Sequence, residues 1–196
     1  MLLHATALSA QETNSSFTKP GTVSVGTRNT LSLFNHDEAA GKGIGGQFRI
    51  QAGKRIGTEW FFDYITSKNG TLTFRNDYHI GWSVMFYPKD IADKKTLQPY
   101  VLVGHCFDYS KVSEQADPSN SMGRWTMAAQ AGLGSHININ DRFDCSVSAQ
   151  YMVHFGKEIN STGDAGKVVI EKENFSSPDG HLLLSVSFNY KLFHLW

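Results

Sequence analysis

Hydrophobic and polar residues alternate with a period of two from Gly21 to the end of the chain. This period is the signature of β-strands, because successive side chains of a strand point to opposite faces. The alternation predicts eight strands, over residues 22–34, 43–53, 57–67, 71–87, 99–110, 125–137, 143–156 and 181–196. Helical periodicity is not convincing anywhere.

The connections between the predicted strands differ in length. Tight turns are expected at 54–56 and 140–142, whereas the segments 111–124 and 157–180 are long and polar. A three-residue hairpin is expected at 68–70. Eight consecutive strands favour closure, since a closed sheet has no exposed edge. The sequence therefore predicts an all-β fold, an eight-stranded antiparallel up-and-down β-barrel over residues 21–196.

Side-chain size indicates which face lies inside. An eight-stranded barrel is barely wide enough for its own side chains. Small residues gather on the polar face of the predicted strands (Gly45, Gly81, Gly104, Gly132, Ser146, Ser185, Ser187), and bulky rings on the apolar face (Trp60, Phe62, Tyr78, Trp82, Trp125, Tyr151, Phe188). This favours a transmembrane barrel with its apolar face toward lipid. A soluble, lipocalin-like barrel is the alternative with inverted faces.

Three polar residues, Asn29, Asn76 and His105, fall on the predicted lipid-facing side. An unpaired polar group is costly there. Either a local β-bulge reverses the facing, or these residues lie near the membrane interface.

Composition narrows the class of protein. The 196 residues carry 18 basic and 18 acidic side chains, so no net charge directs the chain toward nucleic acid. An aromatic content of 12% argues against disorder. The chain has only two cysteines, Cys106 facing inward and Cys145 outward, on strands that are not neighbours, so no disulfide is expected.

Charged residues follow the inward face. We predict a lumen charge network formed by Arg28, Arg49, Glu59, Asp63, Arg75, Asp77, His79 and Lys191. The expected turns place Asp63 opposite Arg75 and Glu59 opposite His79, with Arg49 diagonally between the two acids. Such a network is tolerable only when its members are paired. It forms either a polar plug, which suits eight strands, or a narrow path for water and ions.

No catalytic, cofactor or metal site is predicted. His79, His136 and His154 face inward, but the expected turns place them several residues apart in height, which argues against a shared metal. His36, Asp37 and Ser67 are the one set from which a surface hydrolase could be assembled. Serine is so common in this chain that the set carries little weight, and we expect no enzyme.

The first ten residues, MLLHATALSA, are apolar and end in small residues. They are typical of the end of a secretory signal peptide that is cleaved after Ala10. Residues 11–20 are expected to form a polar linker. A mildly apolar, frayed terminus is the alternative.

The chain resembles the small eight-stranded outer-membrane barrels of Gram-negative bacteria, the OmpA/OmpX-like group, and most of all the outer-membrane β-barrel domains common in Bacteroidetes. The resemblance lies in the segments GTVSVG (21–26), WFFDY (60–64), PYVLVG (99–104) and FNYKLFHLW (188–196). The last is similar to the barrel-assembly signal of the group, with Phe188, Tyr190, Leu192 and Trp196 in its pattern and His194 departing from it.

The resemblance implies a protein of the bacterial outer membrane with both termini in the periplasm. Its expected partners are membrane lipid, lipopolysaccharide and the outer-membrane assembly machinery, with a surface ligand at segments 111–124 and 157–180. We expect a structural or surface-interaction role. A narrow channel for small solutes, a lipid-modifying enzyme and the soluble binder remain the alternatives.

Overall fold

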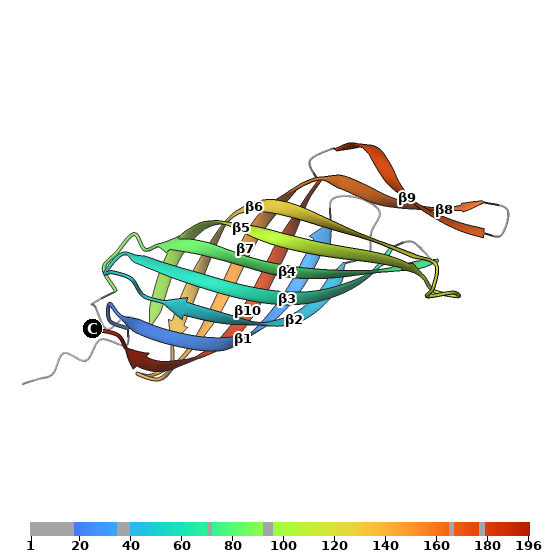
Figure 1. The fold of residues 1–196 in the computed structure, drawn as a ribbon. Coiled ribbons are helices and arrows are strands. Elements are labelled where there is room, and N and C mark those ends of the chain that lie inside the picture. Colours follow the sequence, from blue (N-terminus) through green and yellow to red (C-terminus); the bar gives the residue numbers. More distant parts are fainter. Residues whose placement is uncertain (1–17, 35–39, 70–71, 92–95, 165–166, 177–178) are drawn as a thin grey trace, which may run out of the picture.

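The computed structural model describes residues 18–34, 40–69, 72–91, 96–164, 167–176 and 179–196. Their strands are β1 (Thr22–Phe34), β2 (Gly41–Ile50), β3 (Ile56–Asn69), β4 (Thr73–Phe86), β5 (Leu97–Glu114), β6 (Ser121–Asn138), β7 (Phe143–Phe155), β8 (Lys157–Asp164), β9 (Lys167–Ser176) and β10 (Asp179–His194). Eight of them close into an antiparallel barrel in the order β1-β10-β7-β6-β5-β4-β3-β2 (Figure 1). The predicted fold is confirmed.

The two ends of the barrel differ. β1 begins and β10 ends at the same end, where the C-terminus is marked in Figure 1, and we call this the terminal end. Strands β8 and β9 form a separate two-stranded sheet that projects from the opposite end, the hairpin end (Figure 1). The predicted signal segment, residues 1–10, and most of the predicted linker lie outside the described residues.

The two segments expected as long polar loops are largely strands. Residues 111–114 continue β5 and residues 121–124 begin β6, which leaves a short turn at 115–120. Segment 157–180 contains β8 and β9. Val112 on β5 packs with Ile159 on β8 and Ile170 on β9 in a small apolar cluster. The sequence analysis missed these strands because they contain few apolar residues, and these residues pack in the Val112 cluster rather than in the barrel wall.

The predicted register between β3 and β4 is wrong. Asn69 pairs with Thr73, so the turn lies two residues later than expected. Asp63 therefore lies opposite His79 rather than Arg75, and Glu59 lies opposite Ser83 rather than His79. Both displacements are even numbers of residues. The inward facing of the strands is preserved while every cross-strand partner changes.

The register between β2 and β3 also differs from the prediction. Arg49 lies directly opposite Glu59 instead of diagonally between two acids. This displacement too is even, so Arg49 still faces the lumen, where it is buried.

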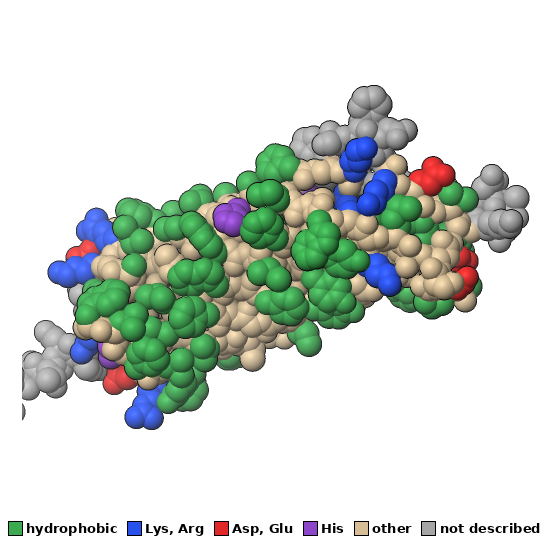
Figure 2. Space-filling model, viewed as in Figure 1, with side chains coloured by type: hydrophobic (Ala, Val, Ile, Leu, Met, Phe, Trp, Pro, Cys, Tyr) green, Lys and Arg blue, Asp and Glu red, His purple; other side chains and the backbone are tan. Residues whose placement is uncertain are grey.

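Large apolar side chains cover the outer wall of the barrel (Figure 2). Trp60, Phe62, Ile80, Val103 and Phe107 are among those exposed there. Toward the hairpin end, rings from four adjacent strands form a chain of contacts, Tyr64–Tyr78–Tyr109–Trp125, with centroid separations of 5.0, 6.1 and 4.9 Å. Such a belt with aromatic residues near its edge is what a lipid-facing barrel wall requires.

Helices long and apolar enough to cross a membrane do not occur in the described part of the chain.

The three polar residues expected on the outer wall lie there without a β-bulge at their positions. Asn29 Nδ2 donates a hydrogen bond to the Val186 carbonyl (3.5 Å), and Asn76 Oδ1 accepts one from the Tyr64 hydroxyl (3.0 Å). The His105 ring packs against Trp82, with ring centroids 5.4 Å apart. Of the two explanations left open by the sequence, the local reversal is therefore excluded.

The lumen is not polar throughout. Phe61, Ile65, Cys106, Ala128, Met152 and Leu183 form a buried apolar cluster inside the barrel, which we call the apolar layer. The Phe61 ring occupies the space that a side chain on Gly81 would need. An inward glycine thus makes room for an inward ring, which the simple separation of apolar and polar faces did not predict.

Candidate functional site: the barrel lumen

All eight residues of the predicted lumen network are buried. The structure divides them between two regions. Arg28, Arg49, Glu59, Asp63 and Lys191 lie in or below the level of the apolar layer, toward the terminal end, whereas Arg75, Asp77 and His79 lie on the hairpin side. The predicted single network is therefore two groups of charges.

Arg28 is the centre of the first group. Its Nε donates to Asp63 Oδ2 (2.9 Å) and its Nη1 to Glu59 Oε1 (3.0 Å). The guanidinium carbon lies 4.5 Å from the centroid of the Phe61 ring. One arginine thus neutralises two buried carboxylates and caps the apolar layer, a charge-assisted and cation–π arrangement that suits arginine better than lysine.

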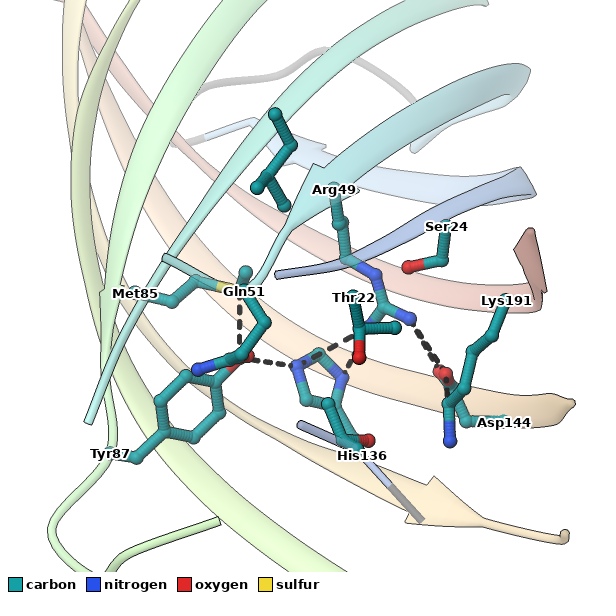
Figure 3. Close-up of a pocket in the computed structure, with 11 residues that line it drawn as sticks. Thr22, Ser24, Arg49, Gln51, Met85, Tyr87, His136, Asp144 and Lys191 are labelled. Carbon is teal, nitrogen blue, oxygen red and sulfur yellow. Dashed lines mark hydrogen bonds and ion pairs between the residues drawn. The ribbon is translucent and has the colours of Figure 1, made fainter. Parts of the chain in front are cut away.

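Arg49 forms a second, bidentate pair with a residue that the sequence analysis missed. Its Nη2 donates to both oxygens of Asp144, at 2.8 and 2.7 Å, as Figure 3 shows in part. Asp144 also accepts a hydrogen bond from Asn189 Nδ2 (2.9 Å), and Lys191 Nζ lies 3.9 Å from its Oδ2. The inward position of Asp144 on β7 was the available signal, but its partner lies on a distant strand.

Side-chain amides join the two pairs. Gln47 Nε2 donates to Asn189 Oδ1 (2.6 Å), and Gln47 Oε1 accepts from Ser187 Oγ (3.0 Å). The same oxygen lies 3.5 Å from Arg28 Nη1. A continuous network of hydrogen bonds therefore crosses the lumen, which rigidifies a buried polar region when its members are satisfied.

His136 extends this network to the terminal end (Figure 3). Its Nδ1 lies 2.7 Å from Arg49 Nη1 and 2.8 Å from Ser146 Oγ, and its Nε2 lies 3.0 Å from the Tyr87 hydroxyl. Because arginine only donates, His136 accepts from the Arg49 guanidinium, whose Nη1 also lies 3.3 Å from Nε2. The Tyr87 ring packs with Met85, Ile91, Tyr100 and Leu102, which close this end of the lumen.

Little space remains beside this network. A cavity of about 20 Å³ is lined by Arg49, Gln51, Tyr87, His136 and Asp144, among others. Such a volume holds about one water molecule.

On the hairpin side, Arg75 Nε donates to Asp77 Oδ1 of the same strand (3.0 Å). Beneath this pair, His79, His154 and His181 come together, with one ring nitrogen from each within 4.8 Å of those of the other two. The expectation that His79 and His154 lie at different heights is wrong, and His181, which the sequence analysis did not consider here, belongs with them. His136 is remote from this cluster, as predicted.

Strand tilt explains the error. His79 lies opposite Asp108 on β5, and His154 lies opposite Ala128, which in turn lies opposite Cys106, two residues from Asp108. Strands in a closed barrel tilt strongly, so each step around the wall also moves along the barrel axis. The movement along the axis from strand to strand therefore brings His79 and His154 to a similar height, although their positions along their own strands suggest different heights.

The other candidates are placed as follows. Ser67 is buried in the wall near the hairpin end, and His36 and Asp37 lie outside the described residues. Cys106 and Cys145 are both free thiols, as expected. In the proposed assembly signal, the side chains of Phe188, Leu192 and Trp196 are exposed on the outer wall or at its end, and Tyr190 is half-buried against Phe143.

No protein-family model matches this sequence, and no curated protein matches it either. Solved structures do match. Neisserial surface protein A shares 14% identity with a TM-score of 0.58, over 87% of this chain and 96% of that one. OprG of Pseudomonas aeruginosa shares 14% with a TM-score of 0.56, over 92% and 100% of the two chains. A major outer-membrane protein of Thermus thermophilus shares 9% with a TM-score of 0.58, over 87% and 99%.

These likenesses establish the fold. The chain has the architecture of small bacterial outer-membrane β-barrels. Together with the apolar outer wall, this architecture agrees with the predicted location in the outer membrane and excludes the soluble barrel with inverted faces.

Proposed function

We propose that the protein is a sealed outer-membrane barrel whose role is structural or lies in contacts made by its hairpin end. The observation that supports the proposal is the set of buried side chains that pack inside the barrel. The Arg28 and Arg49 networks, the apolar layer and the Tyr87 cluster occupy successive levels of the barrel. A solute would have to break buried ion pairs to pass, which costs several kcal/mol for each pair.

Conductance tests the sealed lumen. The refolded protein is reconstituted in planar bilayers beside a conducting porin as a positive control. We expect no conductance steps from the wild-type protein. Steps that change in size in Asp63→Asn or Arg75→Gln would contradict the proposal and support the alternative of a narrow channel, because both residues lie inside the barrel.

The hairpin end supports the surface role. The β8–β9 hairpin is held against the barrel extension by the Val112 cluster, and Asn120 Nδ2 donates to the Val168 carbonyl (2.9 Å). The Arg124 guanidinium also donates to the Lys157 carbonyl. These contacts order a polar surface beyond the lipid-facing wall. We propose that this surface faces the cell exterior and contacts lipopolysaccharide or an external ligand, and that the outer-membrane assembly machinery inserts the barrel through its last strand.

Thiol labelling of intact cells tests this orientation. Ala116→Cys places an accessible thiol in the turn at the hairpin end, and Lys54→Cys places one in a turn at the terminal end. A membrane-impermeant maleimide should label Ala116→Cys on intact cells and Lys54→Cys only after lysis. The reverse pattern would contradict the proposed orientation.

No arrangement in the described residues favours an enzyme. Ser67 is buried inside the barrel, which argues against its use as the accessible nucleophile that the hydrolase alternative needs. We therefore propose a protein without catalytic activity. Unchanged lipid A from cells that overproduce it would agree, whereas modified lipid A that reverts in Ser67→Ala would contradict this.

A further inference from the structure

Three histidines from three separate strands meet inside the hairpin half of the lumen. His79 comes from β4, His154 from β7 and His181 from β10, and each is about 1% exposed. One ring nitrogen from each histidine lies within 4.8 Å of those of the other two. Imidazole nitrogens bound to one zinc ion lie about 3.3 Å apart. Small side-chain rotations would therefore bring all three onto one ion.

Asp108 supplies the second observation. Its Oδ2 lies 3.1 Å from His154 Nδ1, and its Oδ1 lies 3.4 Å from His79 Nε2. A carboxylate that accepts the N–H of a ligating histidine is the usual outer-shell partner at metal sites, since it sets which nitrogen faces the metal. Here one carboxylate would orient two imidazoles.

The buried negative charge of Asp108 also supports a metal ion at this place. Its side chain is fully buried, and its Oδ2 accepts hydrogen bonds from Ser110 Oγ (3.3 Å) and Thr126 Oγ1 (3.2 Å). Among the described residues, its ion-pair contacts are with the rings of His79 and His154. A buried carboxylate needs a positive partner. A bound divalent cation would supply it.

The surroundings define a route. Two members of the apolar layer adjoin the histidines, because Ala128 lies opposite His154 and Met152 lies opposite His181. Toward the hairpin end the lumen is lined by polar side chains, including Ser67, Asp77 and Ser110. An ion would therefore enter from the hairpin end.

We propose that His79, His154 and His181 form a binding site for a first-row transition-metal ion, Zn²⁺ by preference, oriented by Asp108. Three neutral imidazoles with a carboxylate nearby suit Zn²⁺, Cu²⁺ or Ni²⁺ and do not suit Ca²⁺ or Mg²⁺, which require oxygen ligands. The ion would link strands β4, β7 and β10 across the lumen. This site is independent of the proposed surface role.

Calorimetric titration of the refolded, chelator-treated barrel with Zn²⁺ tests the proposal, with Co²⁺ absorption as a second probe. We expect one ion per chain and the visible bands of tetrahedral Co²⁺. His79→Gln and His181→Gln should each weaken binding at least tenfold, and Asp108→Asn about 10–100-fold. The matched control is His105→Gln on the outer wall, which should bind like the wild type. The unheated gel mobility of each variant shows that it is folded.

Two results would overturn the site: no binding by the wild-type barrel, or equal binding by the wild type and the double variant His79→Gln/His181→Gln. Should the variants not fold, the electron paramagnetic resonance spectrum of Cu²⁺ bound to the wild type decides the matter. Coupling to three nitrogen donors supports the site, and coupling to fewer refutes it.

Discussion

The two halves of the lumen solve the burial of polar groups in different ways. In the terminal half, each buried carboxylate faces an arginine: Glu59 and Asp63 face Arg28, and Asp144 faces Arg49. In the hairpin half, Asp77 likewise faces an arginine, Arg75, but Asp108 faces two imidazoles and two hydroxyls instead. A guanidinium carries a permanent charge, whereas an imidazole is charged only when protonated and binds metals when neutral. The arginine pairs of the terminal half therefore keep their charges, whereas the histidines around Asp108 in the hairpin half can bind a metal ion.

The apolar layer adjoins both halves. Phe61 lies against Arg28, and Met152 and Ala128 lie opposite His181 and His154. A region of low polarity strengthens electrostatic interactions on both sides and raises the cost of leaving any group unpaired. We therefore expect substitutions in the two halves to lower the free energy of unfolding by different amounts.

The largest effect is expected from Arg28→Met. The substitution leaves Glu59 and Asp63 buried without their shared cation, and should lower the free energy of unfolding by about 3–5 kcal/mol. Urea unfolding of the refolded protein in lipid vesicles measures this. His79→Gln without metal should cost distinctly less, because no buried charge loses a permanent partner. Equal losses for the two variants would contradict the proposed difference between the halves.

Added Zn²⁺ should give the next largest effect, and only through the hairpin half. At a free concentration one hundred times the dissociation constant, a ligand specific to the folded state stabilises it by about 2.7 kcal/mol. The wild type and Arg28→Met should gain this increment alike, whereas His181→Gln should not gain it. The same unfolding measurement with Zn²⁺ and with a chelator provides the comparison. A gain that persists in His181→Gln would refute the assignment.

A smaller effect is expected from Gly81→Ala in the apolar layer. The added methyl group would lie 2.5 Å from Cζ of the Phe61 ring and 2.8 Å from the His105 carbonyl oxygen, so the ring has to move. Overpacking of this kind costs about 1–3 kcal/mol. Gly53→Ala is the matched control, because nothing lies within 4 Å of the added group. Similar unfolding curves for both variants would show that the layer is not tightly packed.

The smallest effect concerns an ion pair outside the lumen. Arg55 Nε donates to Asp90 Oδ1 (2.5 Å) in the exposed turns of the terminal end, and this hydrogen bond holds the pKa of Asp90 below its ordinary value. Such a pair favours the folded state above the ordinary pKa and loses its effect as the pH falls through the lowered one. Arg55→Met should return the Asp90 pKa to normal in a ¹³C NMR titration, with no measurable change in unfolding at neutral pH. If Arg55→Met lost as much stability as Arg28→Met, burial would not be the reason that the Arg28 ion pairs stabilise the fold.

Much of the fold could be predicted from the sequence. The strand positions are close to those observed, for example 22–34 for β1 and 143–156 for β7 (Phe143–Phe155). The strand extensions at the hairpin end were missed, because polar residues such as Ser113 and Ser121 look like loop residues whether or not the chain is paired there. For the site, alternation placed Arg28, Arg49 and His79 in the lumen. Arg28 does meet Glu59 and Asp63 of the predicted network. The contacts of Arg49 with Asp144 and of His79 with Asp108 and His181 were missed, since the expected turns relate only some neighbouring strands.

The sequence by itself determined which way each side chain faces. That property has a period of two and survives any displacement of a strand by an even number of residues. Only the tertiary structure decided which inward residues meet, because contacts across the lumen depend on strand tilt and on the stagger with which the barrel closes. Closure joins Arg49 on β2 to Asp144 on β7, and brings histidines of β4, β7 and β10 to one level. These contacts cannot be read from the sequence of any single strand.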